Sequence, residues 1–360
     1  MIAGSRPRLH LAHLFRYAVS AALLIRAATL INWREVSVAM GAIAPGQLWL
    51  AVALIALSNA LAGWRWGGLM QCAGFSGRRT RFIGLFFAGG LVNQALPTTL
   101  VGDGYRAFAA AGAGRSLTRS AAPNSSPPLR GITEALAIVG TLRNPGSRER
   151  EALLMVALDR SLGLMGNIAL GAAGLALGGV MIASWLATLG LWVLGLMLFC
   201  TLIVGAHIAR GRLNRALCAL GARLRLAQLD RRIGFAWGWP HNLRQLALSM
   251  LVHILAVAAL GACLSACGTV VPFTALLVAM PAAAILTLLP ISVSGWGLRE
   301  TTLVALLAFW QIPAGPVVIG SILYGALSLL VHLPAAPMLL TRRRDTAGHS
   351  RVSSPMVGRP

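Results

Sequence analysis

The charged residues with the clearest potential for chemistry lie in or beside two copies of one short pattern. Residues 96–106 read LPTTLVGDGYR and residues 289–299 read LPISVSGWGLR, and both fit L-P-x4-G-x-G-x-R. Proline removes a backbone donor and glycine permits strained dihedrals, so each copy predicts a break in an apolar helix. Paired Gly/Pro interruptions at corresponding positions of two apolar halves indicate a ligand-binding site within a membrane.

Seven polar side chains in or near these breaks and at the next apolar segment are the candidate site residues. They are Asn93, Asp103, Arg106, Asp159, Arg160, Arg299 and Glu300. Arginine forks suit bidentate binding of a phosphate, and carboxylates suit pairing with arginines or proton exchange. A charge at bilayer depth is costly unless it is paired or wetted, so one hypothesis places these charges around a shared intramembrane cavity. The alternative places them at the membrane interface, where they cap helices and neutralise one another, while Asn93 satisfies backbone near the first break.

Composition predicts an all-α polytopic membrane protein. The chain is 57% hydrophobic and 11% charged, with a mean hydropathy of +0.74, and several runs approach the roughly 18–20 apolar residues that span a bilayer. The net charge of +22 comes from 31 arginines without any lysine, against nine acidic residues. These arginines lie mostly between apolar segments without interleaved stacking aromatics, which favours anionic lipid headgroups and membrane topology over a nucleic-acid partner.

The order of segments predicts an integral membrane domain at 17–340, between a basic leader at 1–16 and a basic tail at 341–360. Its apolar segments are expected at 17–31, 47–63, 82–101, 153–180, 184–206, 245–267, 273–289, 301–310 and 317–340. A polar loop at 107–152, with a Pro/Ser-rich part typical of an insertion, and a basic cytoplasmic loop at 207–244 separate them. The residues Trp64, Arg65 and Trp66 are predicted to form an interfacial belt.

Arginine placement predicts that 82–106 enters the membrane and returns to the same side. If 82–101 spanned fully, the arginine-rich 106–160 region would lie outside, whereas a re-entrant segment keeps every arginine-rich loop and both termini cytoplasmic. Irregular backbone at membrane depth is tolerated where protein or a water-filled cavity satisfies it. The second copy predicts a similar break at 281–299. We therefore expect about eight transmembrane helices plus two re-entrant or broken segments in an inverted-repeat-like arrangement.

Six motifs occur in order along the chain: Trp33, Arg65-Trp66, Asn93 to Pro97, Gly102 to Arg106, Asp159 to Gly163, and Pro290 to Glu300. With these motifs, residues 20–340 resemble the lysylphosphatidylglycerol synthase transmembrane-region family, also called flippase-like integral membrane proteins. The resemblance implies a bacterial inner-membrane protein with a role in lipid translocation. Two features depart from the family pattern: Val101 replaces the first glycine of a Gly pair, and residues 121–147 are in excess. Because the chain ends soon after its last apolar segment, we expect no soluble aminoacyl-transferase domain and predict no lysyl transfer.

Three functions are compatible with these residues. The favoured one is translocation of a lipid or lipid-linked substrate with an anionic headgroup. The second is an accessory subunit that docks lipid or envelope biosynthesis enzymes through the 207–244 loop. A membrane-lipid-modifying enzyme is less favoured, because the sequence shows no nucleophile–base pair, metal cluster or nucleotide loop, and its five cysteines form no redox framework. We therefore expect neither enzymatic activity nor a cofactor, and we expect His253 and His332 to be packed or hydrogen-bonded.

Overall fold

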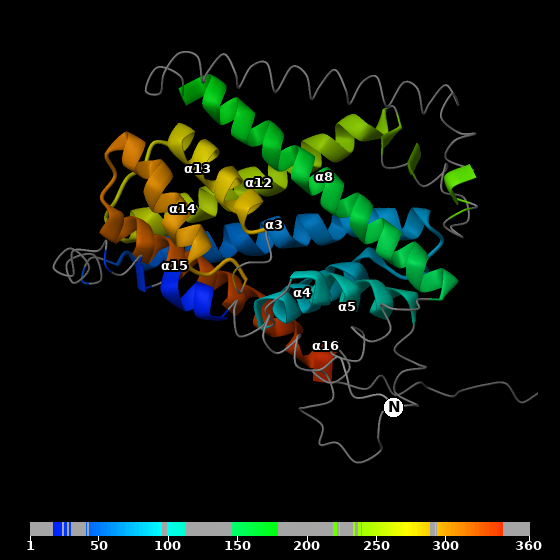
Figure 1. The fold of residues 1–360 in the computed structure, drawn as a ribbon. Helices are drawn as coiled ribbons and strands as arrows, with labels where there is room; N and C mark the ends of the chain where they lie inside the picture. The colour runs from blue at the N-terminus through cyan, green and yellow to red at the C-terminus, as the bar shows by residue number, and fades with distance from the viewer. Residues whose placement is uncertain are drawn as a thin grey trace, which may run out of the picture.

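The computed structural model describes residues 17–23, 25–26, 29, 41, 43–95, 99–112, 146–178, 219–221, 223, 233–234, 237–238, 240–288, 292 and 294–340. The longer elements are α3 (Pro45–Cys72), α4 (Arg79–Ala95), α5 (Thr99–Ala111), α8 (Ser147–Gly178), α12 (His241–Ala266), α13 (Phe273–Leu286), α14 (Leu298–Leu307) and α15 (Ala314–His332). The short helices η1 (Ala308–Trp310), η2 (Leu333–Ala335) and α16 (Ala336–Leu340) follow α14 and α15. All regular structure in these ranges is helical, which confirms the all-α class (Figure 1).

Four stretches of the described chain are helical, long and apolar enough to cross a bilayer. They are Pro45–Cys72, Arg148–Leu177, His241–Ala266 and Ala314–Leu339. The predicted segment at 184–206 and parts of 17–31 lie outside the described residues, as do the leader, the 121–145 part of the predicted insertion and the tail. The described residues therefore supply four candidate spans, and the total of about eight transmembrane helices stays a prediction.

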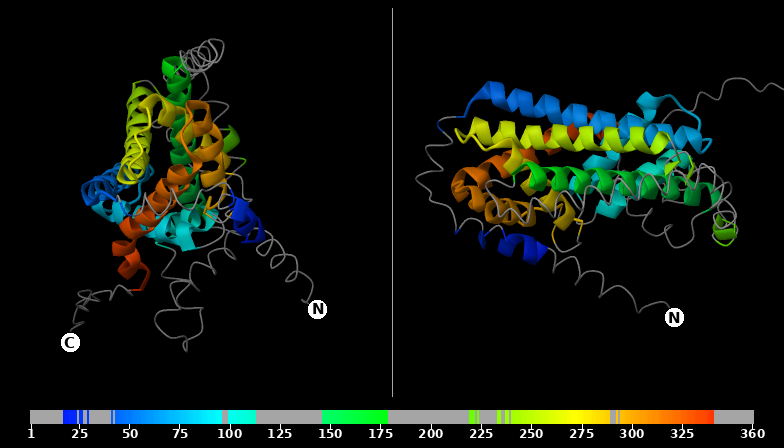
Figure 2. Two further views of the ribbon diagram at one scale, coloured as in Figure 1. Left: turned by 90° about the vertical axis from the view of Figure 1, so that its left-hand side faces the viewer. Right: turned by 90° about the horizontal axis from the view of Figure 1, so that it is seen from above.

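The long helices α3 and α12 lie antiparallel along each other (Figure 2). The Ala44 amide at the start of α3 donates to the Ala266 carbonyl at the end of α12, and further along the buried Ser58 hydroxyl donates to the Val252 carbonyl over 2.9 Å. Hydroxyl-to-carbonyl bonds of this kind hold helices together where apolar lipid supplies no hydrophobic drive. The pair forms the long spine of the described bundle.

Helix α8 crosses this spine through small residues. A Cβ on Gly166 would lie 2.2 Å from the Ser249 hydroxyl of α12, and one on Gly174 would lie 2.8 Å from the Leu277 backbone of α13. Ser249 donates to the Leu162 carbonyl over 2.7 Å, so the close approach is also hydrogen-bonded. Small residues thus allow α8 to contact two helices at backbone distance.

Two helical hairpins correspond to the two sequence copies. In the first, α4 and α5 pack antiparallel on either side of residues 96–98, and in the second, α13 packs against α14 across residues 287–297 (Figure 1). The interruptions agree with the predicted ones only in part. In the first copy, Gly102 and Gly104 lie within α5, and the interruption is confined to residues 96–98. The second break was predicted over 281–299, but Pro281 lies inside α13, and the helix is interrupted only after Leu286. A hairpin is the geometry expected of a segment that enters a membrane and returns to the same side.

Several predicted boundaries are wrong. The polar loop at 107–152 is helical at both ends, since 107–111 complete α5 and 147–152 begin α8. The residues there explain this: 107–111 read AFAAA, and 148–152 alternate arginine and glutamate before alanine, so that all but Phe108 are good helix formers. Likewise α12 begins at His241, inside the predicted 207–244 loop, and α14 begins at Leu298 rather than near residue 301.

Candidate functional site

Five charged side chains from α3, α5 and α8 meet inside the bundle. We call this group the arginine–aspartate cluster: Arg65, Asp103, Arg106, Asp159 and Arg160. Four of the five residues are at most 8% exposed, so the group is an internal network and not a set of surface pairs. Four of its members are predicted site residues that the structure brings together.

Asp159 joins α8 to both α3 and α5. Its Oδ1 accepts from Arg65 Nε at 3.0 Å and Nη2 at 2.9 Å, while Oδ2 accepts from both terminal nitrogens of Arg106 at 3.3 Å. Arg65 Nη2 also donates to the Asp159 backbone carbonyl over 3.2 Å. One buried carboxylate therefore serves two buried guanidinium groups, and its removal would leave both unpaired.

Asp103 joins α5 to the outer side of α8. Its two carboxylate oxygens accept from Arg160 Nε and Nη2, each over 2.8 Å, in a bidentate pair. Asp103 Oδ1 also lies 3.1 Å from Arg106 Nε, one turn along α5, although that N–H is not aligned for a hydrogen bond. The Arg160 side chain is 49% exposed, so it is the accessible edge of the cluster.

Arg106 is enclosed by aromatic rings as well as by charges. Its guanidinium carbon lies 4.8 Å from the ring centres of both Trp66 and Phe86, and Trp66 packs edge-on against Phe82 with ring centres 5.7 Å apart. Cation–π contacts strengthen when the cation is withdrawn from water. The ring contacts therefore hold the Arg106 side chain in place without using its N–H groups.

The cluster carries an excess of positive charge and of hydrogen-bond donors. Three arginines face two aspartates, which leaves one net positive charge. Among the described residues, Arg65 Nη1, Arg106 Nε and Trp66 Nε1 are buried without a hydrogen-bond partner. Buried donors normally have partners, so this group can accept an additional anionic oxygen ligand.

Apolar packing around the cluster explains how the sequence places it. An apolar core from α3, α4, α5 and α8 surrounds the charges and includes Leu69, Met70, Leu85 and Met155. On α3, Gly63 and Gly67 let α4 approach so closely that added Cβ atoms would lie 3.0 Å from Ile83 and Phe82. This low-polarity surrounding strengthens each charge interaction inside it.

The predicted residues of the second copy form a separate group with Ser321 of α15. Glu300, fully buried, accepts from Arg299 Nη2 over 2.7 Å, from the Ser321 hydroxyl over 2.8 Å and from the Gly297 amide over 2.7 Å. Arg299 also donates to the Ser321 hydroxyl and carbonyl. This group is neutral and its carboxylate is saturated, which indicates a structural link between α14 and α15.

In the part of the chain that the structure describes, Arg106 and Arg299 belong to separate polar groups, so the shared cavity stays a prediction. Arg106 pairs with Asp103 and Asp159, whereas Arg299 pairs with Glu300 and Ser321, so the two arginines share no polar partner there. The two copies also differ locally. Arg106 lies within α5, whereas Arg299 is the second residue of α14, directly after the turn at residues 294–297. In that turn Gly295 and Gly297 adopt φ of 78° and 81°, which only glycine adopts easily. The sequence repeat thus encodes two unequal breaks.

Asn93 belongs to the break and not to the charged cluster. Its side-chain oxygen accepts from the Gly102 amide over 2.8 Å, as expected if it satisfies the backbone. Its carbonyl, near the open end of α4, accepts from the Ser294 hydroxyl of the second break. This contact joins the two hairpins at their breaks.

The predicted interfacial belt at 64–66 is wrong for two of its three residues. Arg65 and Trp66 are 5% and 0% exposed, and both take part in the cluster. Sequence reasoning therefore missed Arg65 as a site residue, because Arg flanked by Trp is also the composition of a membrane interface. The one signal that could have found it was its place in the Arg65-Trp66 motif of the family pattern.

Both membrane-helix histidines are hydrogen-bonded, as predicted. His253 Nε2 lies 2.9 Å from the Gly163 carbonyl, and His332 Nδ1 lies 2.6 Å from the Ser328 carbonyl. The His332 ring also packs directly on α4, since a Cβ on Gly90 would lie 2.3 Å from it. These side chains link helices and are not candidates for the site.

A prediction tests the structural assignment of the Arg299–Glu300 pair. Replacing Ser321→Ala should lower the free energy of unfolding by about 2 kcal/mol, because the hydroxyl bonds to both charged partners. Thermal unfolding of the purified protein in detergent measures this. The control Ser161→Ala removes a hydroxyl whose partner among the described residues is the Leu158 carbonyl of its own helix, and it should change stability little. Equal effects of both variants would contradict the assignment.

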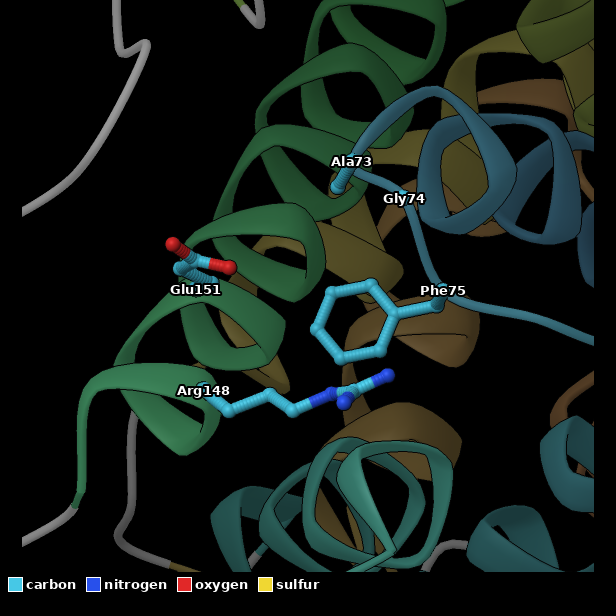
Figure 3. A pocket seen from close by; sticks show the side chains of 5 residues that line it. All are labelled: Ala73, Gly74, Phe75, Arg148 and Glu151. Carbon is cyan, nitrogen blue, oxygen red and sulfur yellow. The ribbon is translucent and has the colours of Figure 1, made fainter.

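A shallow hollow of about 300 Å³ lies outside the cluster, where α3 ends beside the start of α8. Figure 3 shows Ala73, Gly74 and Phe75 on one side and Arg148 and Glu151 on the other. The Arg148 guanidinium lies 5.5 Å from the Phe75 ring centre. The hollow holds none of the predicted site residues, so the cluster remains the candidate site.

Comparison with known proteins agrees with this arrangement. The sequence profile of the family "Lysylphosphatidylglycerol synthase TM region" matches residues 13–123 and 124–336. These ranges include both hairpins and every member of the arginine–aspartate cluster. No curated protein matches the chain. Since the profile covers nearly the whole chain and four described stretches can cross a bilayer, the protein is a multi-pass membrane protein that belongs to the lysylphosphatidylglycerol synthase TM region family.

Proposed function

We propose that this protein translocates a lipid or lipid-linked substrate and binds its anionic headgroup at the arginine–aspartate cluster. The observation that carries the proposal is the cluster's single excess positive charge, which a ligand can reach at the half-exposed Arg160, together with the buried donors Arg65 Nη1 and Trp66 Nε1 that lack hydrogen-bond partners. A buried donor without a partner is costly, so an oxygen ligand that reaches these N–H groups is favoured. An anionic headgroup oxygen is a ligand of matching charge and hydrogen-bonding capacity.

The route to the cluster would lie along Arg160. This side chain is half exposed, while Asp159 and Arg106 behind it are 2% exposed. A headgroup could first pair with the exposed guanidinium of Arg160 and then accept hydrogen bonds from the buried Arg65 and Arg106, with its acyl chains outside the bundle. Charges withdrawn from water hold an anion more strongly than surface charges do.

The first hairpin supports a path across the membrane. Helices α4 and α5 run antiparallel around residues 96–98 and carry two cluster members, Asp103 and Arg106. Together with the positive-inside pattern of the arginine-rich loops, this favours a re-entrant segment, both termini in the cytoplasm and a place in the bacterial inner membrane. The proposal assigns no catalytic step and no cofactor to the protein.

Two single variants test the proposal. Each of Arg106→Ala and Arg299→Ala is reconstituted in nanodiscs that contain phosphatidylglycerol and phosphatidylcholine, and retained lipids are quantified by mass spectrometry. Wild type should retain phosphatidylglycerol preferentially. Arg106→Ala should lose this preference at least about tenfold, which corresponds to one charge-assisted hydrogen-bonded contact.

The variant Arg299→Ala serves as the matched control, because it removes an arginine of the second copy that lies outside the cluster. It should lower stability and keep the lipid preference of the protein that remains folded. If wild type and both variants retain the same bulk lipids, the headgroup site is refuted. An accessory subunit that docks lipid-biosynthesis enzymes then becomes the better proposal.

A further inference from the structure

Asp103 occupies the one part of the cluster that a headgroup could reach from outside. Its carboxylate oxygens bind Arg160 Nε and Nη2 at 2.8 Å each, and the Arg160 side chain is 49% exposed while that of Asp103 is 12% exposed. A phosphate oxyanion binds an arginine fork through the same two parallel bonds. Carboxylate and phosphate would therefore compete for the same two N–H groups.

Asp103 does not lose every partner when it leaves Arg160. Its Oδ1 lies 3.1 Å from Arg106 Nε, an N–H that is buried and not aligned for a hydrogen bond in the present arrangement. A small turn of the carboxylate toward Arg106 could form that bond and free the Arg160 fork. Because Arg106 and Asp103 are one turn apart on α5, the exchange would need no movement of α8.

The charge of the cluster limits which oxyanion fits. With three arginines and two aspartates it carries one net positive charge, which a singly charged oxyanion neutralises. A doubly charged phosphomonoester or a pyrophosphate would leave net negative charge next to the buried carboxylates of Asp103 and Asp159. Buried charge without a counter-ion is strongly unfavourable.

We infer that Asp103 is an internal competitor of the headgroup at Arg160, and that it sets the affinity and restricts the site to singly charged oxyanions such as a phosphodiester. This inference rests on the proposed function of the cluster. It makes Asp103 a specificity-determining residue whose removal strengthens binding, whereas removal of an ordinary ligand residue weakens it.

Isothermal titration of the full chain in detergent tests the inference, with dihexanoyl phosphatidylglycerol as the probe. Asp103→Asn should bind this lipid about tenfold more tightly than wild type, since the amide is a weaker competitor for the guanidinium. Arg160→Gln should bind it about tenfold more weakly. When Arg160→Gln is already present, adding Asp103→Asn should give little gain in affinity, because the Arg160 guanidinium for which Asp103 competes is absent.

Two controls separate competition from a general effect of charge. Glu151→Gln also removes one carboxylate from the protein. Glu151 lies on α8 about two turns before Asp159 and outside the cluster, so this variant should leave the affinity unchanged. If Asp103→Asn strengthens binding equally with and without Arg160, the gain is general electrostatics and the competition is refuted. Should Asp103→Asn fail to fold, Arg160→Gln alone decides, since unchanged affinity in that variant also refutes the inference.

The remaining comparisons identify the ligand. Dimethyl phosphate carries the same single charge without acyl chains and should bind more weakly than the lipid; equal affinities would refute a lipid source and favour a free oxyanion. Inorganic phosphate at pH 8, which is mostly doubly charged, should bind more weakly than dimethyl phosphate, and tighter binding would refute the charge limit.

If wild type binds dihexanoyl phosphatidylglycerol no better than dihexanoyl phosphatidylcholine, the proposed function fails. If that preference holds while Asp103→Asn shows no gain, only the inference about Asp103 fails.

Discussion

Replacing Asp159→Asn should destabilise the protein by about 3–5 kcal/mol, the range measured when one partner of a buried ion pair is removed. Asp159 is the shared acceptor of Arg65 and Arg106, and all three residues are at most 5% exposed. The variant leaves three arginines facing one aspartate in a low-polarity interior. Thermal unfolding in detergent, together with the yield of monodisperse protein, measures the loss.

Glu151→Gln is the matched control for this variant, because it makes the same change of a carboxylate to an amide on the same helix α8. Glu151 borders the shallow hollow at the surface, where ion pairs contribute at most about 1 kcal/mol (Figure 3). Equal stabilities for Asp159→Asn and wild type would show that the arginines do not depend on this carboxylate. The buried network would then be wrong.

Replacing Gly102→Ala should separate the two helices of the first hairpin and lower stability by about 3 kcal/mol or more. A Cβ at this position would lie 2.1 Å from the Gly89 carbonyl oxygen and 2.3 Å from Asn93 Oδ1. The first of these atoms is backbone, so no change of rotamer relieves the overlap. Because Asp103 and Arg106 follow on the same helix, headgroup binding should be lost together with stability.

Gly46→Ala is the control for the glycine variant. Gly46 lies in the first turn of α3 with nothing within 4 Å of an added Cβ, so alanine should be neutral or slightly stabilising there. Thermal unfolding and lipid retention are measured for both variants. Normal lipid retention by Gly102→Ala would contradict the close packing of α4 on α5.

The sequence by itself determined the class of the protein and the approximate positions at which two of its apolar segments are interrupted. Composition predicts membrane helices because every apolar segment must satisfy its own backbone in lipid. The pattern at 96–106 and 289–299 predicts an interruption near each copy because Pro and Gly act on the backbone locally. It does not give the exact bounds, since Gly102 and Gly104 lie within α5. Asp103, Arg106, Asp159 and Arg160 could be singled out for a similar reason, since charges in or beside apolar segments need partners.

Only the tertiary structure decided which charges are partners. Arg65 reaches Asp159 from a helix 94 residues earlier, and its sequence neighbourhood of tryptophans is equally typical of a membrane interface. Arg106 and Arg299 have the same position in the repeat, yet one enters a network with excess positive charge and the other a neutral link to Ser321. Pairing depends on which helices pack together, and the close contacts at Gly63, Gly67, Gly102 and Gly166 that fix this packing are not visible in a local pattern.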